Sequence, residues 1–417
     1  MRPHLQRNNK NKIVNDPVYG FITIPNILIY DLIQHPYFQR LRRITQLGLS
    51  NLVYPGAMHT RFHHVLGATH LMTLAIAVLR RKGHEITLDE EEAVLAAILL
   101  HDIGHGPFSH ALEYDIVNNV SHEKISTFFI EEINRQMNGK LDLTLLIFQN
   151  KYTKKPFLYQ LVSSQLDMDR LDYLNRDSFY SGVTEGQIGA DRIIEMLNVY
   201  EGNLVVEEKG IYSVEKFLVA RRFMYWQVYL HKTVVAAEFM LINILRRAKE
   251  LTRQGKGVFA PPALKFFLEN DIREQDFLEN KEVLKHFANL DDADIISSFK
   301  VWQYHEDKVL SILSRKLIQR KLFKIEVDKS EYGIDRINFE RELVKAYYSL
   351  TDEEAKYFVY SETLTNSAYN LMKQNIKILM KSGEVVDASK ASDNYNLEAL
   401  SKTVTKYFLS YPLMDKV

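Results

Sequence analysis

Apolar residues recur at three- and four-residue spacing as far as about residue 320, a period that predicts amphipathic helices. Thr87 followed by Glu90 is a capping-box signature, which begins a helix that runs to about His101. A stretch with two glycines and a proline, 104–107, breaks this helix. The same periodicity predicts further helices over residues 27–47, 65–79, 157–179, 214–249 and 309–322.

The pattern changes after Lys324, where short β-type runs alternate with helical stretches. Lys381-Ser382-Gly383 separates two of these runs and is typical of a hairpin turn. Strands are expected at 323–327, 357–362, 376–380 and 384–386, and helices at 339–350 and 397–409. The pattern predicts a mainly α protein, with a helical lobe over 1–324 and a smaller C-terminal α+β lobe over 325–417.

Composition restricts the kinds of partner. The 417 residues carry 53 Lys plus Arg and 53 Asp plus Glu, so no overall charge draws the chain to nucleic acid or an anionic membrane. The absence of cysteine excludes disulfides, zinc–thiolate sites and thiol catalysis. The N-terminus has no apolar signal region, and apolar runs such as 93–100 are too short to cross a bilayer. We expect a cytoplasmic protein that binds neither membrane nor nucleic acid.

The candidate metal-binding and catalytic residues lie mainly in three segments, 61–67, 100–110 and 167–173. His101 and Asp102 stand together at a helix end, and such nitrogen and oxygen donors suit Mn, Fe, Mg or Zn. His64 and Asp169, on other helices, are candidates to complete the set. An isolated His-Asp pair is usually a surface dipeptide, but here His105, His110 and His122 follow within a short stretch.

Two helical stripes are consistent with a polar ligand. Asp169, Tyr173 and Asp177 are spaced four residues apart, as are Arg221, Tyr225 and Tyr229. Together they can present carboxylates, phenols and a guanidinium to one site. The alternative is that aromatic stripes at this spacing belong to the core.

The order of His64, His101-Asp102 and Asp169 resembles the H…HD…D pattern of the HD phosphohydrolases. Residues 15–20, 38–42, 46–48, 54–57 and 101–110 are similar to those of the deoxynucleoside triphosphate triphosphohydrolases within that superfamily. The resemblance runs from about Lys12 to Lys324 and is weak in the C-terminal lobe. It implies an HD-domain helical bundle whose core covers about 50–180.

The resemblance further implies that His64, His101, Asp102 and Asp169 hold one divalent metal ion, of Mn, Fe, Mg, Ni or Zn. Metal-activated water would attack the α-phosphorus and release a deoxynucleoside and triphosphate. His110 matches the family's proton donor, and Glu113, His122 and His105 lie close to it in sequence. His122 has the alternative reading of a surface residue that follows Ser121 at a helix start.

By the same resemblance, Arg61, Arg170 and Arg221 contact phosphates, and Tyr173 and Asp177 lie at the sugar. Three residues line the sugar and base pocket: Gln46, Leu47 and Tyr229. Leu47 alternatively only packs the helix that begins near Ile27. One relative has Lys in place of Arg170 and His in place of Tyr225, so base contacts at Tyr225 differ from that relative's.

Relatives in the family bind nucleotide effectors between subunits, so we expect a homo-oligomer, either a dimer or a tetramer. The matching residues are Lys12, Gln34, Arg42, Arg320 and Lys324. Gln34 replaces the carboxylate that recognises guanine in one relative, which predicts activation that is absent or broad across nucleotides. Arg320 and Lys324 are alternatively a solvated basic helix end.

Two other functions stay open from the sequence. One is an HD phosphohydrolase that acts on another nucleotide, such as a monophosphate or an alarmone. The other is a nucleotide-sensing HD protein with little turnover. Product analysis separates the first from the predicted reaction, because only triphosphohydrolysis releases intact triphosphate.

Overall fold

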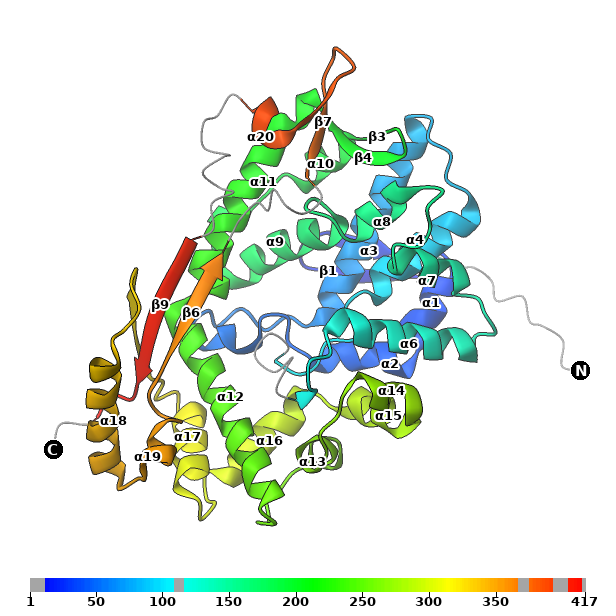
Figure 1. Cartoon of the computed structure of the whole chain (residues 1–417). Coiled ribbons are helices and arrows are strands. Elements are labelled where there is room, and N and C mark those ends of the chain that lie inside the picture. The colour runs from blue at the N-terminus through cyan, green and yellow to red at the C-terminus, as the bar shows by residue number, and fades with distance from the viewer. Residues whose placement is uncertain (1–11, 109–115, 367–374, 393–403, 415–417) are drawn as a thin grey trace, which may run out of the picture.

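The computed structural model describes residues 12–108, 116–366, 375–392 and 404–414 of the chain. Helix α3 (Arg61–Arg81) lies at the centre and packs against α4 (Leu88–Leu100) and α9 (Met168–Ser181) (Figure 1). The apolar run 93–100 of α4 is entirely buried, which explains why that helix is apolar all round. By length and composition α3 could cross a membrane, but 72% of its most apolar window is buried in the fold.

The remaining helices surround this centre or form the C-terminal part of the chain. They are α1 (Ile27–Gln34), α2 (Pro36–Gln39), α6 (His122–Gln136), α7 (Asp142–Phe148), α8 (Pro156–Val162), α10 (Ala190–Glu195), α11 (Ile211–Met224), α12 (Lys232–Arg253), α13 (Pro262–Glu269), α14 (Glu274–Glu279), α15 (Lys281–Asn289), α16 (Asp292–Trp302), α17 (Lys308–Ile318), α18 (Ile334–Tyr348), α19 (Asp352–Ala355) and α20 (Ala388–Ala391). Short 3-10 turns are η1 (Arg40–Arg43), η2 (Gly48–Leu52), η3 (Thr184–Gly186) and η4 (Glu208–Gly210), and η5 (Tyr225–Tyr229) is π-helical.

The predicted start of α4 is confirmed, since the Thr87 hydroxyl accepts from the Glu90 amide and the Glu90 carboxylate accepts from the Thr87 amide. Three predicted long helices are wrong because each is interrupted. The segment 27–47 breaks at His35, which is extended before Pro36. The segment 157–179 breaks after Val162, and Asp167 then caps α9. The segment 214–249 breaks at η5 and restarts after His231.

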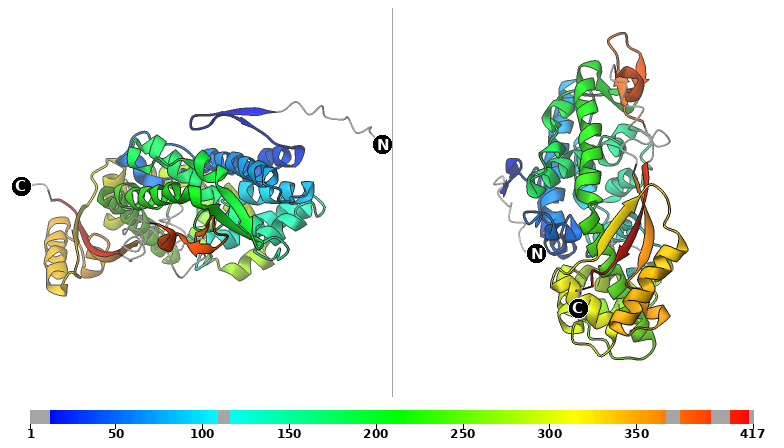
Figure 2. Two further views of the ribbon diagram at one scale, coloured as in Figure 1. Left: turned by 90° about the horizontal axis from the view of Figure 1, so that it is seen from above. Right: turned by 90° about the vertical axis from the view of Figure 1, so that its left-hand side faces the viewer.

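The strands form three small sheets. The hairpin of β1 (Ile13–Asp16) and β2 (Gly20–Thr23) lies along the outside of the helical body, as Figure 2 shows. A second sheet has the order β3 (Leu197–Tyr200), β4 (Asn203–Glu207), β7 (Lys377–Leu379) and β8 (Val385–Asp387). A third has the order β5 (Lys324–Asp328), β9 (Val404–Tyr411) and β6 (Tyr360–Asn366). Neither the β1–β2 nor the β3–β4 hairpin was predicted.

The predicted hairpin around Lys381-Ser382-Gly383 is confirmed by the antiparallel pairing of β7 with β8. The predicted helix over 397–409 is wrong where the structure describes it. Residues 404–409 belong to β9, which pairs with β5 on one side and β6 on the other, and 397–403 lie outside the described residues. The mainly α fold with strands in its C-terminal part is confirmed.

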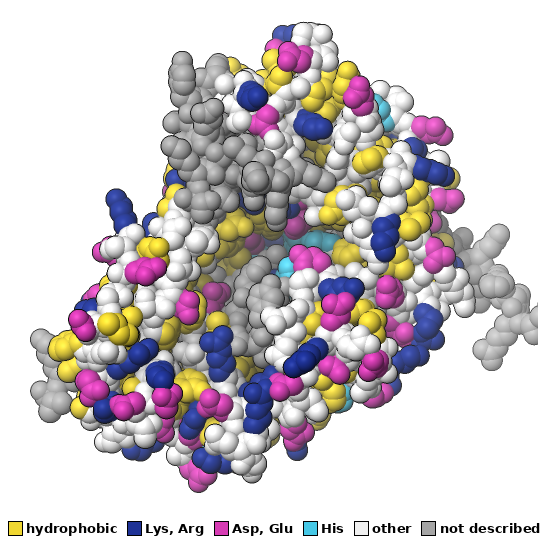
Figure 3. Space-filling model, in the orientation of Figure 1, with side chains coloured by type: hydrophobic (Ala, Val, Ile, Leu, Met, Phe, Trp, Pro, Cys, Tyr) yellow, Lys and Arg dark blue, Asp and Glu magenta, His cyan; other side chains and the backbone are white. Residues whose placement is uncertain are grey.

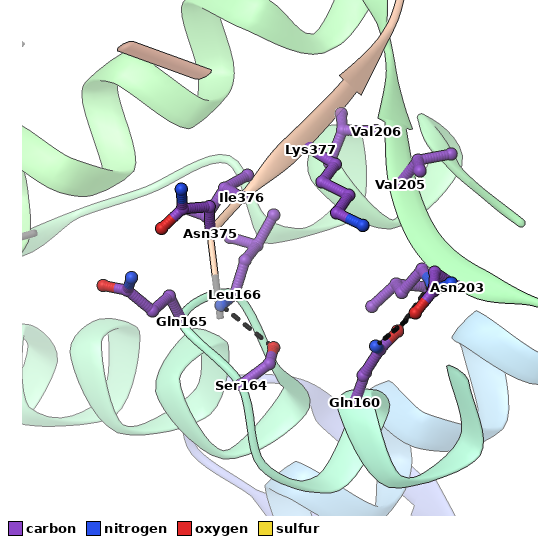
Figure 4. A pocket seen from close by; sticks show the side chains of 11 residues that line it. Gln160, Ser164, Gln165, Leu166, Asn203, Val205, Val206, Asn375, Ile376 and Lys377 are labelled. Atoms are coloured by element: carbon purple, nitrogen blue, oxygen red, sulfur yellow. Dashed lines mark hydrogen bonds between the residues drawn. The ribbon is translucent and has the colours of Figure 1, made fainter. Parts of the chain in front are cut away.

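The C-terminal segment packs on the helical lobe at two places. Val235 and Ala236 of α12 form a small core with Ile325, Leu364 and Phe408 of the third sheet. At the other end β7 pairs in parallel with β4, beside a cavity of about 270 Å³ (Figure 4). Its lining combines aliphatic side chains with the amide side chains of Gln160, Gln165, Asn203 and Asn375. The division into lobes at 324/325 stays a prediction.

Candidate active site

Three predicted metal ligands meet between α3, the end of α4 and the start of α9. Nε2 of His64 lies 3.4 Å from Nε2 of His101, and Oδ1 of Asp169 lies 3.1 Å from the former and 3.4 Å from the latter. One donor atom from each residue lies within 4.8 Å of the others. The structure thus places two imidazole nitrogens and a carboxylate oxygen around one point.

Both imidazole rings are held by their other nitrogen. Nδ1 of His101 lies 2.7 Å from the carbonyl oxygen of Ile98, which can only accept, so Nδ1 carries the proton. Nδ1 of His64 lies 2.7 Å from Oδ2 of the fully buried Asp172. In each ring, this leaves Nε2 to face the cluster, the arrangement expected of histidines that bind metal.

Asp102, the fourth predicted ligand, borders the cluster. Its Oδ1 lies 3.2 Å from His101 Nε2 and 3.3 Å from His105 Nε2. Its Oδ2 accepts a hydrogen bond from Nη1 of Arg61 at 2.6 Å. Arg61, predicted to contact phosphate, therefore uses one donor to hold Asp102.

The electrostatics of this cluster suit a cation. Burial opposes ionisation, but His101 and Arg61 hold the pKa of Asp102 well below its usual range. The pKa of Asp169 is likewise lowered, against burial, by His101 and His64. Burial also opposes charge on His64, but hydrogen bonds to Asp169 and Asp172 raise its pKa to about 10. The carboxylates that raise the pKa of His64 would also favour a divalent metal ion, which would replace the proton on Nε2 and leave a donor set of carboxylate oxygens and imidazole nitrogens.

A cavity of about 1050 Å³ opens beside the cluster. Figure 3 shows histidine side chains at the bottom of a hollow near the centre of one face. His101, Asp102 and Asp169 line the cavity, together with these predicted residues: Gln46, Leu47, Arg61, His105, His122, Arg170, Tyr173, Asp177, Tyr225 and Tyr229. The volume exceeds that of most small-molecule sites and can hold a nucleotide.

Two arginines next to this cavity keep buried N–H groups without a hydrogen-bond partner among the described residues. They are Nε of Arg170 and both Nε and Nη1 of Arg221. Arg170 also forms an ion pair with Asp167, while the guanidinium of Arg221 lies 5.8 Å from the ring centre of Tyr225. Buried donors of this kind usually have partners, so these groups point to an anionic ligand.

Asp177 is fixed by two neighbours. Its Oδ1 lies 2.7 Å from Nε2 of His59, and its Oδ2 accepts a hydrogen bond of 2.8 Å from the Tyr229 hydroxyl. The His59 ring stacks on Tyr180 at 4.4 Å. Neither His59 nor Asp172 was singled out from the sequence. Asp172 follows Asp169 by three residues and shares its helix face, a signal that could have indicated it.

The stripe of Arg221, Tyr225 and Tyr229 is not a simple helical face. The π-helical turn η5 covers Tyr225–Tyr229 and leaves the two tyrosine rings 5.1 Å apart, nearly perpendicular at 86°. Single π-helical turns inserted in helices are frequent at functional sites. Both rings line the cavity, whereas Arg221 is not among its lining residues.

The predicted proton-transfer residues are only partly described. The rings of His105 and His122 stack with centres 3.8 Å apart and an angle of 17°. Burial, then the nearby Arg61, lowers the pKa of His105 well below its usual value. His110 and Glu113 lie outside the described residues.

The predicted effector residues all lie outside the described lining of the cavity. Lys12 and Gln34 are exposed, and Nζ of Lys12 donates to the Tyr30 hydroxyl at 2.5 Å. The guanidinium of Arg42 lies 3.6 Å from the ring centre of Phe62.

The other two predicted effector residues, Arg320 and Lys324, make contacts with other parts of the chain. Nε of Arg320 donates to the Leu52 carbonyl at 2.8 Å, and Lys324 pairs with Glu326 at 2.8 Å.

Comparison with known proteins agrees with this geometry. A profile of the HD domain matches residues 61–175, and one of the HD associated region matches 188–257. The uncharacterized protein YwfO of Bacillus subtilis is 33% identical, over 97% of this chain and 93% of its own length. A deoxynucleoside triphosphate triphosphohydrolase SAMHD1 homolog of Dictyostelium discoideum is 28% identical, over 67% of this chain and 59% of its own length.

The fold is also known from crystals. A phosphohydrolase from Bacteroides thetaiotaomicron superposes with a TM-score of 0.94 and 55% sequence identity, over 97% of this chain and all of that one. The donor cluster, the HD-domain match and these relatives agree. The chain belongs to the HD-domain phosphohydrolases, and within them it is similar to the deoxynucleoside triphosphate triphosphohydrolases.

Proposed function

We propose that this protein hydrolyses deoxynucleoside triphosphates to a deoxynucleoside and triphosphate. The observation that carries the proposal is one cavity beside the His64, His101 and Asp169 cluster whose lining also includes Arg61, Arg170, Leu47, Asp177 and Tyr229. His64, His101, Asp102 and Asp169 would hold one divalent ion. A bound divalent ion there would polarise a phosphoryl oxygen and lower the pKa of water.

The arginines would bind the polyphosphate. Arg170 lines the cavity with one buried N–H group unpartnered among the described residues, and Arg221 has two such groups beside the Tyr225 ring. Such donors form charge-assisted hydrogen bonds to phosphate oxygens and offset their negative charge. Arg61 holds Asp102 in place and contributes further positive charge at the phosphate end.

Leu47, Asp177 and Tyr229 would bind the sugar. Asp177 is held by His59 and Tyr229, which leaves its remaining lone pairs as acceptors for a 3′-hydroxyl. Leu47 has no polar atom, so a 2′-hydroxyl against it would be buried without a partner. Together they favour deoxyribose over ribose.

Proton transfer to the leaving group is assigned to His110, by the resemblance. His122 is the second candidate, because its ring lines the cavity and stacks on His105. Glu113 would tune this pair of residues. A neutral His105, held so by burial, is suited to accept or donate hydrogen bonds without adding charge.

The wider assembly belongs to the same proposal. The chain would act in the cytoplasm as a homo-oligomer, with a nucleotide effector held by Lys12, Gln34, Arg42, Arg320 and Lys324 of neighbouring copies. The Dictyostelium relative carries the triphosphohydrolase name, and transfer of that activity to this chain is part of the proposal.

The test is product analysis with each dNTP and either Mn²⁺ or Mg²⁺, by chromatography. The expected products are the deoxynucleoside and intact triphosphate. His101→Ala should abolish the reaction, whereas His84→Ala, a change in a loop outside the cavity lining, should not. Release of a deoxynucleoside monophosphate, or turnover of monophosphates or alarmones only, would replace this proposal by another phosphohydrolase activity. Binding without turnover would favour a nucleotide sensor.

A further inference from the structure

Glu238 of α12 is an acidic residue of the cavity lining that the metal, phosphate and sugar contacts do not use. It lies opposite the turn at Gly48 and the Phe108 ring. A Cβ atom built on Gly48 would lie 3.8 Å from Oε1 of Glu238 and 4.0 Å from Cδ1 of Phe108. Its carboxyl group makes no hydrogen bond or ion pair with any residue that the structure describes.

The charged form of the Glu238 carboxyl group is disfavoured at this position. Burial raises the pKa of Glu238 to about 7, and no described charged neighbour offsets this effect. Glu238 is partly buried and lines the cavity, so its carboxylate oxygens, which have no partner among the described residues, can accept hydrogen bonds from a ligand in the cavity.

The residues around Glu238 indicate which part of a nucleotide would lie next to its carboxyl group. Gly48 directly follows Gln46 and Leu47, the residues proposed for the sugar and base. Oε1 of Gln46 is also buried without a partner among the described residues. Two acceptors and the Phe108 ring therefore lie beside the proposed sugar site. A nucleobase, which has an aromatic face and a polar edge, matches this set.

We propose, on the basis of the proposed function, that Glu238 recognises the hydrogen-bonding edge of the nucleobase and favours guanine over thymine. Guanine presents two adjacent donors, N1–H and the 2-amino group, which a carboxylate accepts in parallel. Adenine and cytosine present one amino group. Thymine presents a single N–H between two carbonyl oxygens, which would face the carboxylate oxygens unfavourably.

The experiment compares all four dNTPs on the full-length protein at pH 8.5, where Glu238 is ionised. Binding is measured at equilibrium in EDTA, and kcat/KM is measured separately with Mn²⁺. We expect dGTP to be favoured over dTTP by about tenfold or more, as for one well-placed charged hydrogen bond. Glu238→Gln, which keeps the shape, should narrow this ratio to within about threefold by weakening dGTP and improving dTTP.

Two further variants make the result decisive. Glu250→Gln, at a more exposed position of the same helix, should leave the base ratio unchanged. Glu238→Asp keeps the charge on a shorter side chain and should lower the ratio only in part. Binding of dTTP by each variant reports that its cavity is folded.

The outcomes separate the two proposals. Equal binding of the four dNTPs by the wild type, or a Glu238→Gln effect that is the same for all four, overturns this inference while dNTP hydrolysis stands. Base-selective binding with no triphosphate released supports the role of Glu238 and overturns the proposed function instead.

Discussion

Nε2 of His59 lies 2.7 Å from Oδ1 of Asp177, and both side chains are almost completely buried. The second oxygen of Asp177 is bound to Tyr229. His59 thus positions an acidic group of the cavity without lining the cavity itself.

We expect His59→Ala to lower kcat/KM for dNTPs by about 10- to 100-fold, because a displaced Asp177 no longer orients the sugar. His59→Gln carries a side-chain N–H near the position of Nε2 and should recover most of the activity. Metal content should be unchanged in both. Activity of His59→Ala within threefold of the wild type would show that Tyr229 alone fixes Asp177.

The purified protein should contain about one divalent transition metal per chain, measured by mass spectrometry. His101→Ala and Asp102→Ala should each lose the metal and the activity together, since three remaining donors bind too weakly. His84→Ala is the matched control and should keep both. Stoichiometric metal in both ligand variants would contradict the assignment of the ligands.

Sugar selection gives a second kinetic prediction. If Leu47 and Tyr229 exclude the 2′-hydroxyl, dATP should be preferred to ATP by about 100-fold or more in kcat/KM, from an unpaired buried hydroxyl and steric overlap. Leu47→Ala and Tyr229→Ala should each lower the ratio of kcat/KM for dATP to that for ATP. Equal wild-type rates on dATP and ATP would replace the dNTPase proposal by a general nucleotide phosphohydrolase.

Gly67→Ala tests the packing around His64. A Cβ atom there would overlap Oδ1 of Asp172 and Nη2 of Arg176, a buried ion pair. We expect a loss of about 3 kcal/mol in the free energy of unfolding, as for overpacking or disruption of a buried pair. Gly257→Ala is the control, since nothing lies within 4 Å of the added atom. Equal denaturant midpoints for the two variants would show that α3 and α9 separate easily.

Glu238 also predicts a pH dependence of stability. Its pKa in the fold is about 7, against 4.5 for an ordinary glutamate, so the folded protein holds this proton more tightly than the unfolded chain does. The stability it contributes is complete below about pH 4.5 and is lost as pH rises through 7. Relative to the wild type, Glu238→Gln should gain stability between these values, by up to about 3 kcal/mol.

The measurement is chemical unfolding in EDTA at pH 5 and pH 8. Burial raises the pKa of Asp292 to about 6, so Asp292 also lowers the stability of the fold as pH rises. Some pH dependence of stability should therefore remain in the Glu238→Gln variant. The free energy of unfolding of Glu250→Gln should differ from that of the wild type by an amount that changes little with pH. If the change in the free energy of unfolding caused by Glu238→Gln is the same at pH 5 and pH 8, the carboxyl group is solvated in the folded protein.

The features predicted best from the sequence are those that residues close together in the chain determine. The capping box at Thr87 defined the start of α4, and the motif around His101 indicated the donor cluster. Interruptions were missed where a single polar residue restarts a helix, as Asp167 does for α9. The strand β9 was missed because its pairing with β5 and β6 joins residues far apart in the chain. His59 was missed for the same reason, since it acts through Asp177, 118 residues away.

One buried chain of contacts links the surface hairpin to the candidate metal site. Asp16, at the end of β1, pairs with Arg176, Arg176 pairs with Asp172, and Asp172 holds His64. Only three side chains, those of Asp16, Arg176 and Asp172, lie between the hairpin and a proposed metal ligand. In this fold, a continuous series of ion pairs joins a hairpin on the outside of the helical body to the buried His64 imidazole.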